Sequence, residues 1–221
     1  LLTVLFVVLT INAVNFVDGL DGLAAGIVGI AATAFFVYAF LLSVEFGFDR
    51  ATLAALICAL LAGICVGFLP HNLNPARLFM GDTGSMLIGL LLAASAITLS
   101  GRVDPSAVRG ELLLPAILPL LLPLAVIAVP LLDVAMAVVR RTRRGRSPFA
   151  PDKEHLHHRL IELGHSQRRA VALMYAWTAL IAFSAVAVAL VPWPVALVVF
   201  LAGLAGLAFL VSRPAAALSR R

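Results

Sequence analysis

Long, uninterrupted apolar runs dominate this sequence, and they constrain its fold more than any other feature. Of the 221 residues, 62% are hydrophobic and only 12% are charged. A soluble domain carries roughly 25% charged residues, whereas an apolar run of about 20 residues is long enough to cross a bilayer as a helix. No stretch of this chain is polar enough to form a soluble domain. The sequence therefore predicts an all-α polytopic integral membrane protein with a single transmembrane domain over residues 1–221.

The apolar runs predict about seven transmembrane helices. They lie at approximately 1–11, 23–43, 51–69, 84–99, 112–139, 170–190 and 194–212. The span 112–139 contains Pro115, Pro119, Pro123 and Pro130, and proline interrupts the backbone ladder of a helix, so we expect this helix to be kinked. Two readings of the kink stay open: a lateral groove for a lipid chain, or merely irregular packing.

The distribution of basic residues predicts the orientation in the membrane. Seven spans place the loops 12–22, 70–83 and 140–169 and the C-terminal tail on one side. That side carries thirteen of the sixteen Lys and Arg residues. Because positive charge is retained in the cytoplasm, we expect these three loops and the C-terminus to be cytoplasmic, at a bacterial inner membrane. Three polar segments lie on that side, which favours chemistry at one face over movement of a solute through the bilayer.

The first polar segment follows the first span and contains Asn15, Asp18 and Asp21. Carboxylates three positions apart lie on one side of a helical turn, and Gly19 and Gly22 permit close approach of the backbone to a ligand. Ionisable groups at membrane depth are costly and indicate function. The alternative is a solvated loop in which Asp21 caps the next helix.

The second polar segment runs from His71 to Ser85 and places Asp82 between glycines, just before an apolar run. Thr83 or Ser85 is positioned to cap the helix that follows, whose N-terminal amides would favour a phosphate. Proteins commonly hold Mg²⁺ through one or two carboxylates and the phosphate oxygens of the substrate. The alternative is a plain turn of Asp and Gly.

The third polar segment contains His155, His157, His158 and Arg159. Histidine and arginine donate hydrogen bonds to phosphate oxygens, so this cluster suits phosphate binding. A zinc site is the alternative, which the absence of a neighbouring cysteine disfavours. The preceding arginines, from Arg140 to Arg146, are better explained as an anchor to anionic lipid.

At these three segments the chain resembles the polyprenyl-phosphate N-acetylhexosamine-1-phosphate transferases, known as the MraY/WecA family or glycosyltransferase family 4. Residues 12–24 (NAVNFVDGLDGLA) resemble the central aspartate motif of the family, and residues 79–85 (FMGDTGS) resemble its magnesium motif. Residues 155–160 (HLHHRL) resemble its histidine motif in the form of the WecA branch. Order and spacing agree over essentially the whole chain.

The resemblance implies a reaction and a set of roles. The reaction is transfer of N-acetylglucosamine 1-phosphate from UDP-N-acetylglucosamine to undecaprenyl or decaprenyl phosphate, releasing UMP, with Mg²⁺ as cofactor and Mn²⁺ as a substitute. By likeness to the family, the metal is held by Asp82 and Asn15. The implied catalytic residues are Asp82, Asp18, His155, His157 and His158, and the implied substrate-binding residues are Asn15, Asp21, Asn72, Phe79 and Arg159. Among them, Asp18 and Asp21 would line the nucleotide site, and Asn72 and Phe79 would contact the uracil. The implied partners are the two substrates, the lipid bilayer and a second copy in a homodimer, with no nucleic acid.

One departure and several alternatives accompany this interpretation. The family carries a pair of adjacent aspartates on an earlier cytoplasmic loop, and no such pair occurs here. The chain also begins inside an apolar run without methionine, so we expect an N-terminal truncation and a catalytically incomplete chain. Alternatives are phospho-MurNAc-pentapeptide transfer, a non-catalytic remnant, and a transporter. A transporter would place ionisable residues at mid-bilayer, whereas the spans 23–43, 51–69 and 84–99 contain no charged residue apart from their ends.

Overall fold

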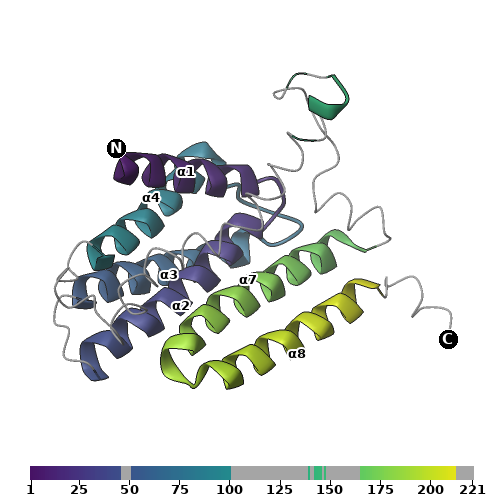
Figure 1. Cartoon of the computed structure of the whole chain (residues 1–221). Helices are drawn as coiled ribbons and strands as arrows, with labels where there is room; N and C mark the ends of the chain where they lie inside the picture. The colour runs from purple at the N-terminus through teal and green to yellow at the C-terminus, as the bar shows by residue number, and fades with distance from the viewer. Residues whose placement is uncertain (46–50, 101–138, 140–141, 146, 148–164, 213–221) are drawn as a thin grey trace.

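The computed structural model describes residues 1–45, 51–100, 139, 142–145, 147 and 165–212. Among these residues the chain is helical and contains no strand. The long helices are α1 (Leu2–Val17), α2 (Leu23–Glu45), α3 (Thr52–Asn72), α4 (Gly81–Ser100), α7 (Gln167–Leu190) and α8 (Trp193–Ser212) (Figure 1). The predicted all-α membrane fold is confirmed.

Five of these helices, α2, α3, α4, α7 and α8, are long and apolar enough to cross a membrane. Helix α1 is apolar but has only 16 residues, so at 1.5 Å per residue it is about 24 Å long, shorter than the roughly 30 Å hydrocarbon core. Six of the seven predicted spans therefore correspond to helices. The predicted proline-kinked span 112–139 lies outside the described residues.

The helices continue further into the polar segments than the sequence indicated. Helix α1 ends at Val17 rather than before Asn12, α3 continues through Pro70 to Asn72, and α4 already begins at Gly81. The loops predicted at 12–22 and 70–83 thus shrink to 18–22 and 73–80. The hydrophobicity of the sequence falls at the edge of the lipid, but a helix continues until its backbone hydrogen bonds end. The helices can therefore extend beyond the apolar runs. The predicted loop 140–169 lies mostly outside the described residues, and α7 takes up its last three positions.

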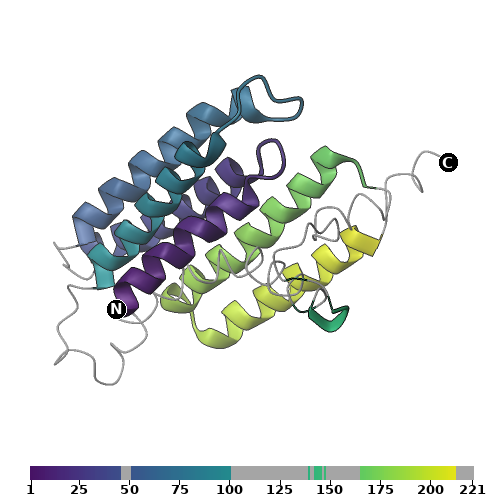
Figure 2. The same ribbon diagram turned by 90° about the horizontal axis from the view of Figure 1, so that it is seen from above.

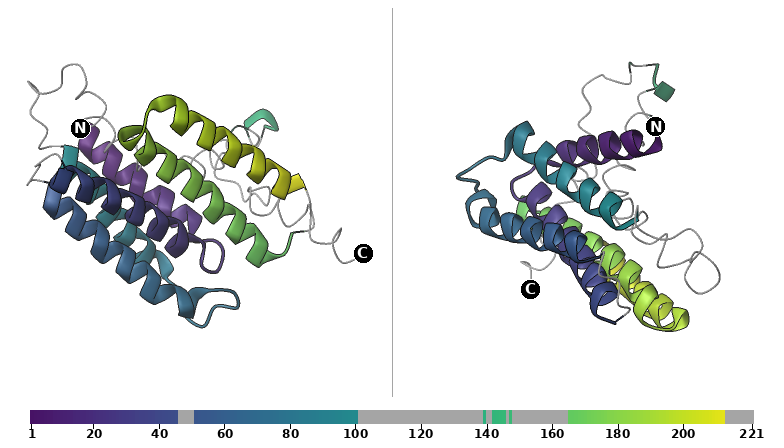
Figure 3. Two further views of the ribbon diagram at one scale, coloured as in Figure 1. Left: turned by 90° about the horizontal axis from the view of Figure 1, so that it is seen from below. Right: turned by 90° about the vertical axis from the view of Figure 1, so that its left-hand side faces the viewer.

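Helix α2 lies at the centre of the described bundle and packs against α1, α3, α4 and α7, while α1 pairs with α4 and α7 with α8 (Figures 2 and 3). Small side chains dominate its buried surface, which lets neighbouring backbones approach. A Cβ placed on Gly29 would lie 3.0 Å from the Cβ of Cys65. Cys58 and Cys65 are both free and buried in this core, facing other helices.

Neighbouring helix ends meet at one end of the bundle. Hydrogen bonds there join the end of α1 to the start of α4, the residue before α2 to the end of α3, and the start of α7 to the loop after α3. His165, just before α7, lies 3.0 Å from the carbonyl of Val211 near the end of α8. We call residues 15–22, 71–85 and 165–175 the polar end. The first two polar segments of the sequence therefore lie together at this end.

Candidate functional site

Helices α1 and α4 pack closely just before the polar end, where Gly89 leaves room for α1. A Cβ placed on Gly89 would lie 3.0 Å from the Cα of Ile11 and 3.2 Å from the Cβ of Val14. One turn closer to the polar end, the hydroxyl of Ser85 donates a hydrogen bond of 2.6 Å to the side-chain oxygen of Asn15. Ser85 is fully buried. This bond therefore fixes the first turns of α4 beside the last turn of α1.

The pairing of α1 with α4 brings two carboxylates together. Asp18 directly follows α1, and Asp82 lies exposed in the first turn of α4. Burial, and after it the negative charge of Asp82, raises the pKa of Asp18 from 3.8 to about 6. Both effects disfavour the charged form of a carboxyl group. A cation placed between the two groups would relieve the repulsion, so this pair is the candidate metal site.

The donor set at this pair fits Mg²⁺. Asp18, Asp82 and the carboxamide of Asn15 offer oxygen atoms, which hard cations prefer. The oxygen of Asn15 accepts one hydrogen bond from Ser85 and keeps a second lone pair. In the described part of the chain no three His, Cys, Asp or Glu side chains form a metal-binding group. Two carboxylates are enough for a cation that is shared with substrate phosphates.

Asp21 serves a different purpose from Asp18, although only three positions separate them. Residues 18–22 form a turn rather than a helix, so the expectation that both carboxylates lie on one side of a helical turn was wrong. One oxygen of Asp21 accepts hydrogen bonds from the side chain of Asn74, at 2.9 Å, and from the backbone N–H of Ala76, at 3.2 Å. Asp21 therefore connects the first loop of the polar end to the second.

Asn72 is a structural centre of the polar end. It is buried; its side-chain oxygen accepts from the Gly22 N–H at 3.0 Å, and its side-chain nitrogen donates to the Leu78 carbonyl at 2.9 Å. The role implied for Asn72, direct contact with uracil, stays a prediction, and its described contacts are with the loops. Phe79, by contrast, is 74% exposed, and its ring is free to stack on a ligand.

The predicted capping of α4 by Thr83 or Ser85 was wrong in register. Helix α4 begins at Gly81, whose φ of +65° suits glycine, so both hydroxyl residues lie within the helix. The hydroxyl of Ser85 then reaches α1 rather than the amides of its own first turn. The exposed first turn of α4 carries Asp82, whose charge acts on Asp18.

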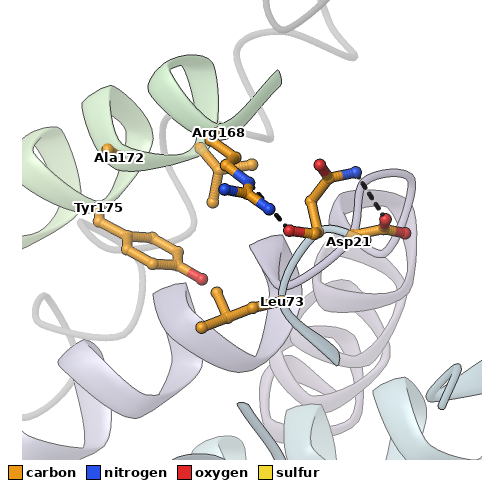
Figure 4. A pocket seen from close by; sticks show the side chains of 7 residues that line it. Asp21, Leu73, Arg168, Ala172 and Tyr175 are labelled. Atoms are coloured by element: carbon orange, nitrogen blue, oxygen red, sulfur yellow. Dashed lines mark hydrogen bonds between the residues drawn. The ribbon is translucent and has the colours of Figure 1, made fainter. Parts of the chain in front are cut away.

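A pocket of about 430 Å³ adjoins the Asp21 loop on its α7 side (Figure 4). Its walls are largely apolar, and Asp21 and Arg168 provide the charged groups. The pocket is lined by Asp21, Leu73, Asn74, Arg168, Val171, Ala172 and Tyr175. A mostly apolar cavity with a few convergent polar groups is typical of a small-molecule site.

Sequence reasoning missed three residues of this region. Asn74 lies in the recognised second segment but was given no role, Arg168 was counted only as a topological charge, and Tyr175 was hidden in an apolar run. The one available signal was polarity inside or beside a span, which applies to many positions. Of the other predicted site residues, His155, His157, His158 and Arg159 lie outside the described residues.

The fold and the polar end define a class: a multi-pass helical membrane protein whose paired carboxylates meet at one end of the bundle. Comparison with known proteins supports a family assignment. Residues 1–100, which contain both carboxylates, match the model described as glycosyl transferase family 4. The recognition from sequence motifs is thereby confirmed.

Named relatives agree with this assignment. The chain is 50% identical over 186 residues, 84% of its length, to the decaprenyl-phosphate N-acetylglucosaminephosphotransferase of Mycolicibacterium smegmatis, of which the match covers 46%. It is 53% identical over 131 residues (59% of the chain, 32% of the relative) to the enzyme of the same name from Mycobacterium tuberculosis H37Rv. It is 33% identical over 141 residues (61% and 35%) to the undecaprenyl-phosphate alpha-N-acetylglucosaminyl 1-phosphate transferase of Escherichia coli K12. The chain spans less than half the length of these relatives.

Proposed function

We propose that this protein transfers N-acetylglucosamine 1-phosphate from UDP-N-acetylglucosamine to a polyprenyl phosphate, as the first step of a cell-envelope glycan. The observation that carries the proposal is the pairing of Asp18 and Asp82 at the meeting ends of α1 and α4. The names and similarity of the relatives support the choice of sugar and lipid. Because the chain matches less than half of each relative, the activity is proposed for the complete protein.

The reaction joins two anions, which explains why the site needs positive charge. An oxygen of the polyprenyl phosphate forms a bond to the phosphorus that carries the sugar. The bond from that phosphorus to the bridging oxygen breaks, and UMP leaves with this oxygen. Repulsion between the phosphates opposes the step, and preorganised cationic groups offset it. Mg²⁺, when bound, neutralises charge on the phosphate oxygens.

The residues of this chain have distinct tasks in the proposal. Asp82, with Asn15, would hold Mg²⁺, and Asp18 would line the nucleotide side of the same site. Ser85 orients Asn15 through its hydrogen bond. The exposed ring of Phe79 would stack on uracil, while Asn72 keeps the loop that carries this ring in place.

The polar end would face the cytoplasm of a bacterial inner membrane, where nucleotide sugars are made. The excess of Lys and Arg on the loops of that side supports this orientation. With the five long apolar helices spanning the bilayer, the polar end would lie at the membrane surface. The phosphate of the lipid substrate would meet the nucleotide sugar at that surface.

A label-transfer assay tests the proposal. Membranes that contain the protein expressed from its complete gene would receive labelled UDP-N-acetylglucosamine, polyprenyl phosphate and Mg²⁺. We expect lipid-linked label with the wild type, and a loss of at least about a hundredfold without Mg²⁺ or with Asp82→Asn, the order found when a charge-stabilising group is removed from a site. Glu45→Gln is the matched control, because it also removes one carboxylate but lies at the last residue of α2, away from the polar end.

The outcomes separate the alternatives. Label that survives Asp82→Asn would show that the metal is not held there. Label obtained only with UDP-MurNAc-pentapeptide would replace the proposed sugar, and label with neither donor would remove the reaction class. The same assay on the 221-residue chain alone tests the expectation that it is catalytically incomplete, which turnover at the rate of the complete protein would refute.

A further inference from the structure

Two polar side chains near the start of α7 form hydrogen bonds to the other segments of the polar end. The first is Tyr175, whose hydroxyl donates a hydrogen bond to the carbonyl of Gly22. Its ring lies directly on α2, because a Cβ placed on Gly26 would be 2.0 Å from the ring carbon Cζ. Glycine at 26 thus makes room for the ring, and the φ of +80° at Gly22 is one that glycine adopts without strain.

The second side chain is Arg168, in the first turn of α7. Its Nε donates to the backbone carbonyl of Asn74 at 2.9 Å, and the Asn74 side chain donates to the Asp21 carboxylate, also at 2.9 Å. Figure 4 shows these two bonds in sequence, from α7 across the loop to Asp21. Two consecutive hydrogen bonds therefore connect α7 to a carboxylate that lies on a different loop.

The two contacts act on the same pair of loops from one helix. Gly22 accepts from Tyr175 through its carbonyl and donates to Asn72 through its N–H. Ala76 donates its N–H to Asp21. If both α7 contacts were lost, the turn 18–22 and the loop 73–80 would still be joined to each other, but they would lose both of their hydrogen bonds to the side chains of Arg168 and Tyr175.

We propose that Arg168 and Tyr175 are positioning residues that fix the turn of Asp21 and the loop of Phe79 against α7, and so shape the nucleotide-sugar side of the site. This inference rests on the proposed function for its kinetic consequence, but not for its structural one. The alternative for Arg168 is direct contact of its cation with a substrate phosphate, since the residue is exposed.

A matched pair of substitutions distinguishes these two roles. In glutamine, the side-chain nitrogen stands the same number of bonds from Cα as Nε does in arginine, so Arg168→Gln keeps a donor near Asn74 and removes the charge. Arg168→Met keeps an unbranched side chain but removes both the hydrogen-bond donor and the charge. Tyr175→Phe removes the hydroxyl and keeps the ring on Gly26. Gln167→Met, on the preceding residue, is the control for a methionine in this turn.

Amide hydrogen exchange of the purified 221-residue chain in detergent tests the structural part. We expect Arg168→Met to speed exchange at Ala76 by about tenfold, the order of one lost hydrogen bond, and Tyr175→Phe to do the same at Gly22. Arg168→Gln and Gln167→Met should stay within about twofold of the wild type. The amide of Leu73, the residue after α3, donates to the Leu69 carbonyl in the last turn of that helix and should exchange equally in all variants. Unchanged exchange at Ala76 and Gly22 would overturn the proposal.

Kinetics of the complete protein tests the functional part. We expect Arg168→Met and Tyr175→Phe to raise KM for UDP-N-acetylglucosamine by about tenfold while KM for polyprenyl phosphate stays constant, and Arg168→Gln to restore the wild-type value. Equal losses for Arg168→Gln and Arg168→Met would assign the cation to the substrate and overturn the positioning role. If the wild type transfers no label at all, the proposed function fails, and hydrogen exchange alone decides whether α7 positions the loops.

Discussion

The hydroxyl of the buried Ser85 donates a hydrogen bond of 2.6 Å to the side-chain oxygen of the half-buried Asn15, and this bond joins the start of α4 to the end of α1. Asp82 lies three residues before Ser85, and Asp18 three residues after Asn15. The bond therefore holds together the two helix ends that carry or precede these carboxylates. Its loss should alter the stability of the bundle and the binding of a divalent cation together.

Ser85→Ala should destabilise the chain by about 1 kcal/mol, because a half-buried acceptor, the Asn15 side-chain oxygen, loses its partner. It should also weaken Mg²⁺ binding, since Asn15 is then free to rotate. Thermal unfolding in detergent and Mg²⁺ titration of the purified chain measure the two effects. Ser95→Ala is the control, because Ser95 is also buried on α4 but its hydroxyl bonds to the Leu92 carbonyl and the Cys58 thiol, not to Asn15. An equal loss of Mg²⁺ affinity in both variants would contradict the role of Asn15.

Gly89→Ala should lower the unfolding temperature, because its Cβ would come within 3.0 Å of the α1 backbone and push the two helices apart. Overpacking of this kind costs about 1–3 kcal/mol. Gly67→Ala on α3 is the matched control: a Cβ there meets no described atom within 4 Å, and alanine favours a helix over glycine by about 1 kcal/mol. The prediction fails if the two variants unfold at the same temperature.

Asp18 should titrate with a pKa of about 6, well above that of an ordinary aspartate. Asp82→Asn removes the repelling charge and should lower this pKa, though not to 3.8, because burial is the larger cause. Added Mg²⁺ should lower it as well, since a nearby cation favours the carboxylate. Cation binding should accordingly weaken as the pH falls through 6. Carboxyl ¹³C NMR of labelled aspartate measures the titration. A pKa of Asp18 that does not change with Asp82→Asn would show that the charge of Asp82 does not act on Asp18.

Asn72→Ala and Phe79→Ala should have different consequences, although both residues are implied in uracil binding. Asn72→Ala leaves the Gly22 N–H without its acceptor and should cost roughly 1–3 kcal/mol of stability. Phe79→Ala should leave stability within about 0.5 kcal/mol, since the ring is 74% exposed, but reduce affinity for UMP. Thermal unfolding and UMP titration decide this, and a large stability loss with Phe79→Ala would show that the ring is structural.

The sequence determined the elements and the class of site. Lipid requires long apolar helices, so composition alone located six of the observed helices to within a few residues at most ends. Polar residues beside such helices are rare, and Asp18 and Asp82 were therefore conspicuous. The resemblance of the motifs to a family of known function then implied roles for these positions and for Asn15 and Phe79.

The tertiary structure decided which polar residues work together. Asp18 and Asp21 are three positions apart, yet Asp18 lies near Asp82 of α4 and Asp21 bonds to Asn74 and Ala76. The different partners of Asp18 and Asp21 depend on where α1 ends and on the direction of the turn that follows. Backbone hydrogen bonds set both, and the hydrophobic pattern of the sequence does not encode them. Likewise Arg168 and Tyr175 acquire their contacts only because α7 packs against α2. Arg168 lies 94 residues from Asn74 in the chain, and Tyr175 lies 153 residues from Gly22. Contacts between such distant segments leave no periodic pattern in a single sequence.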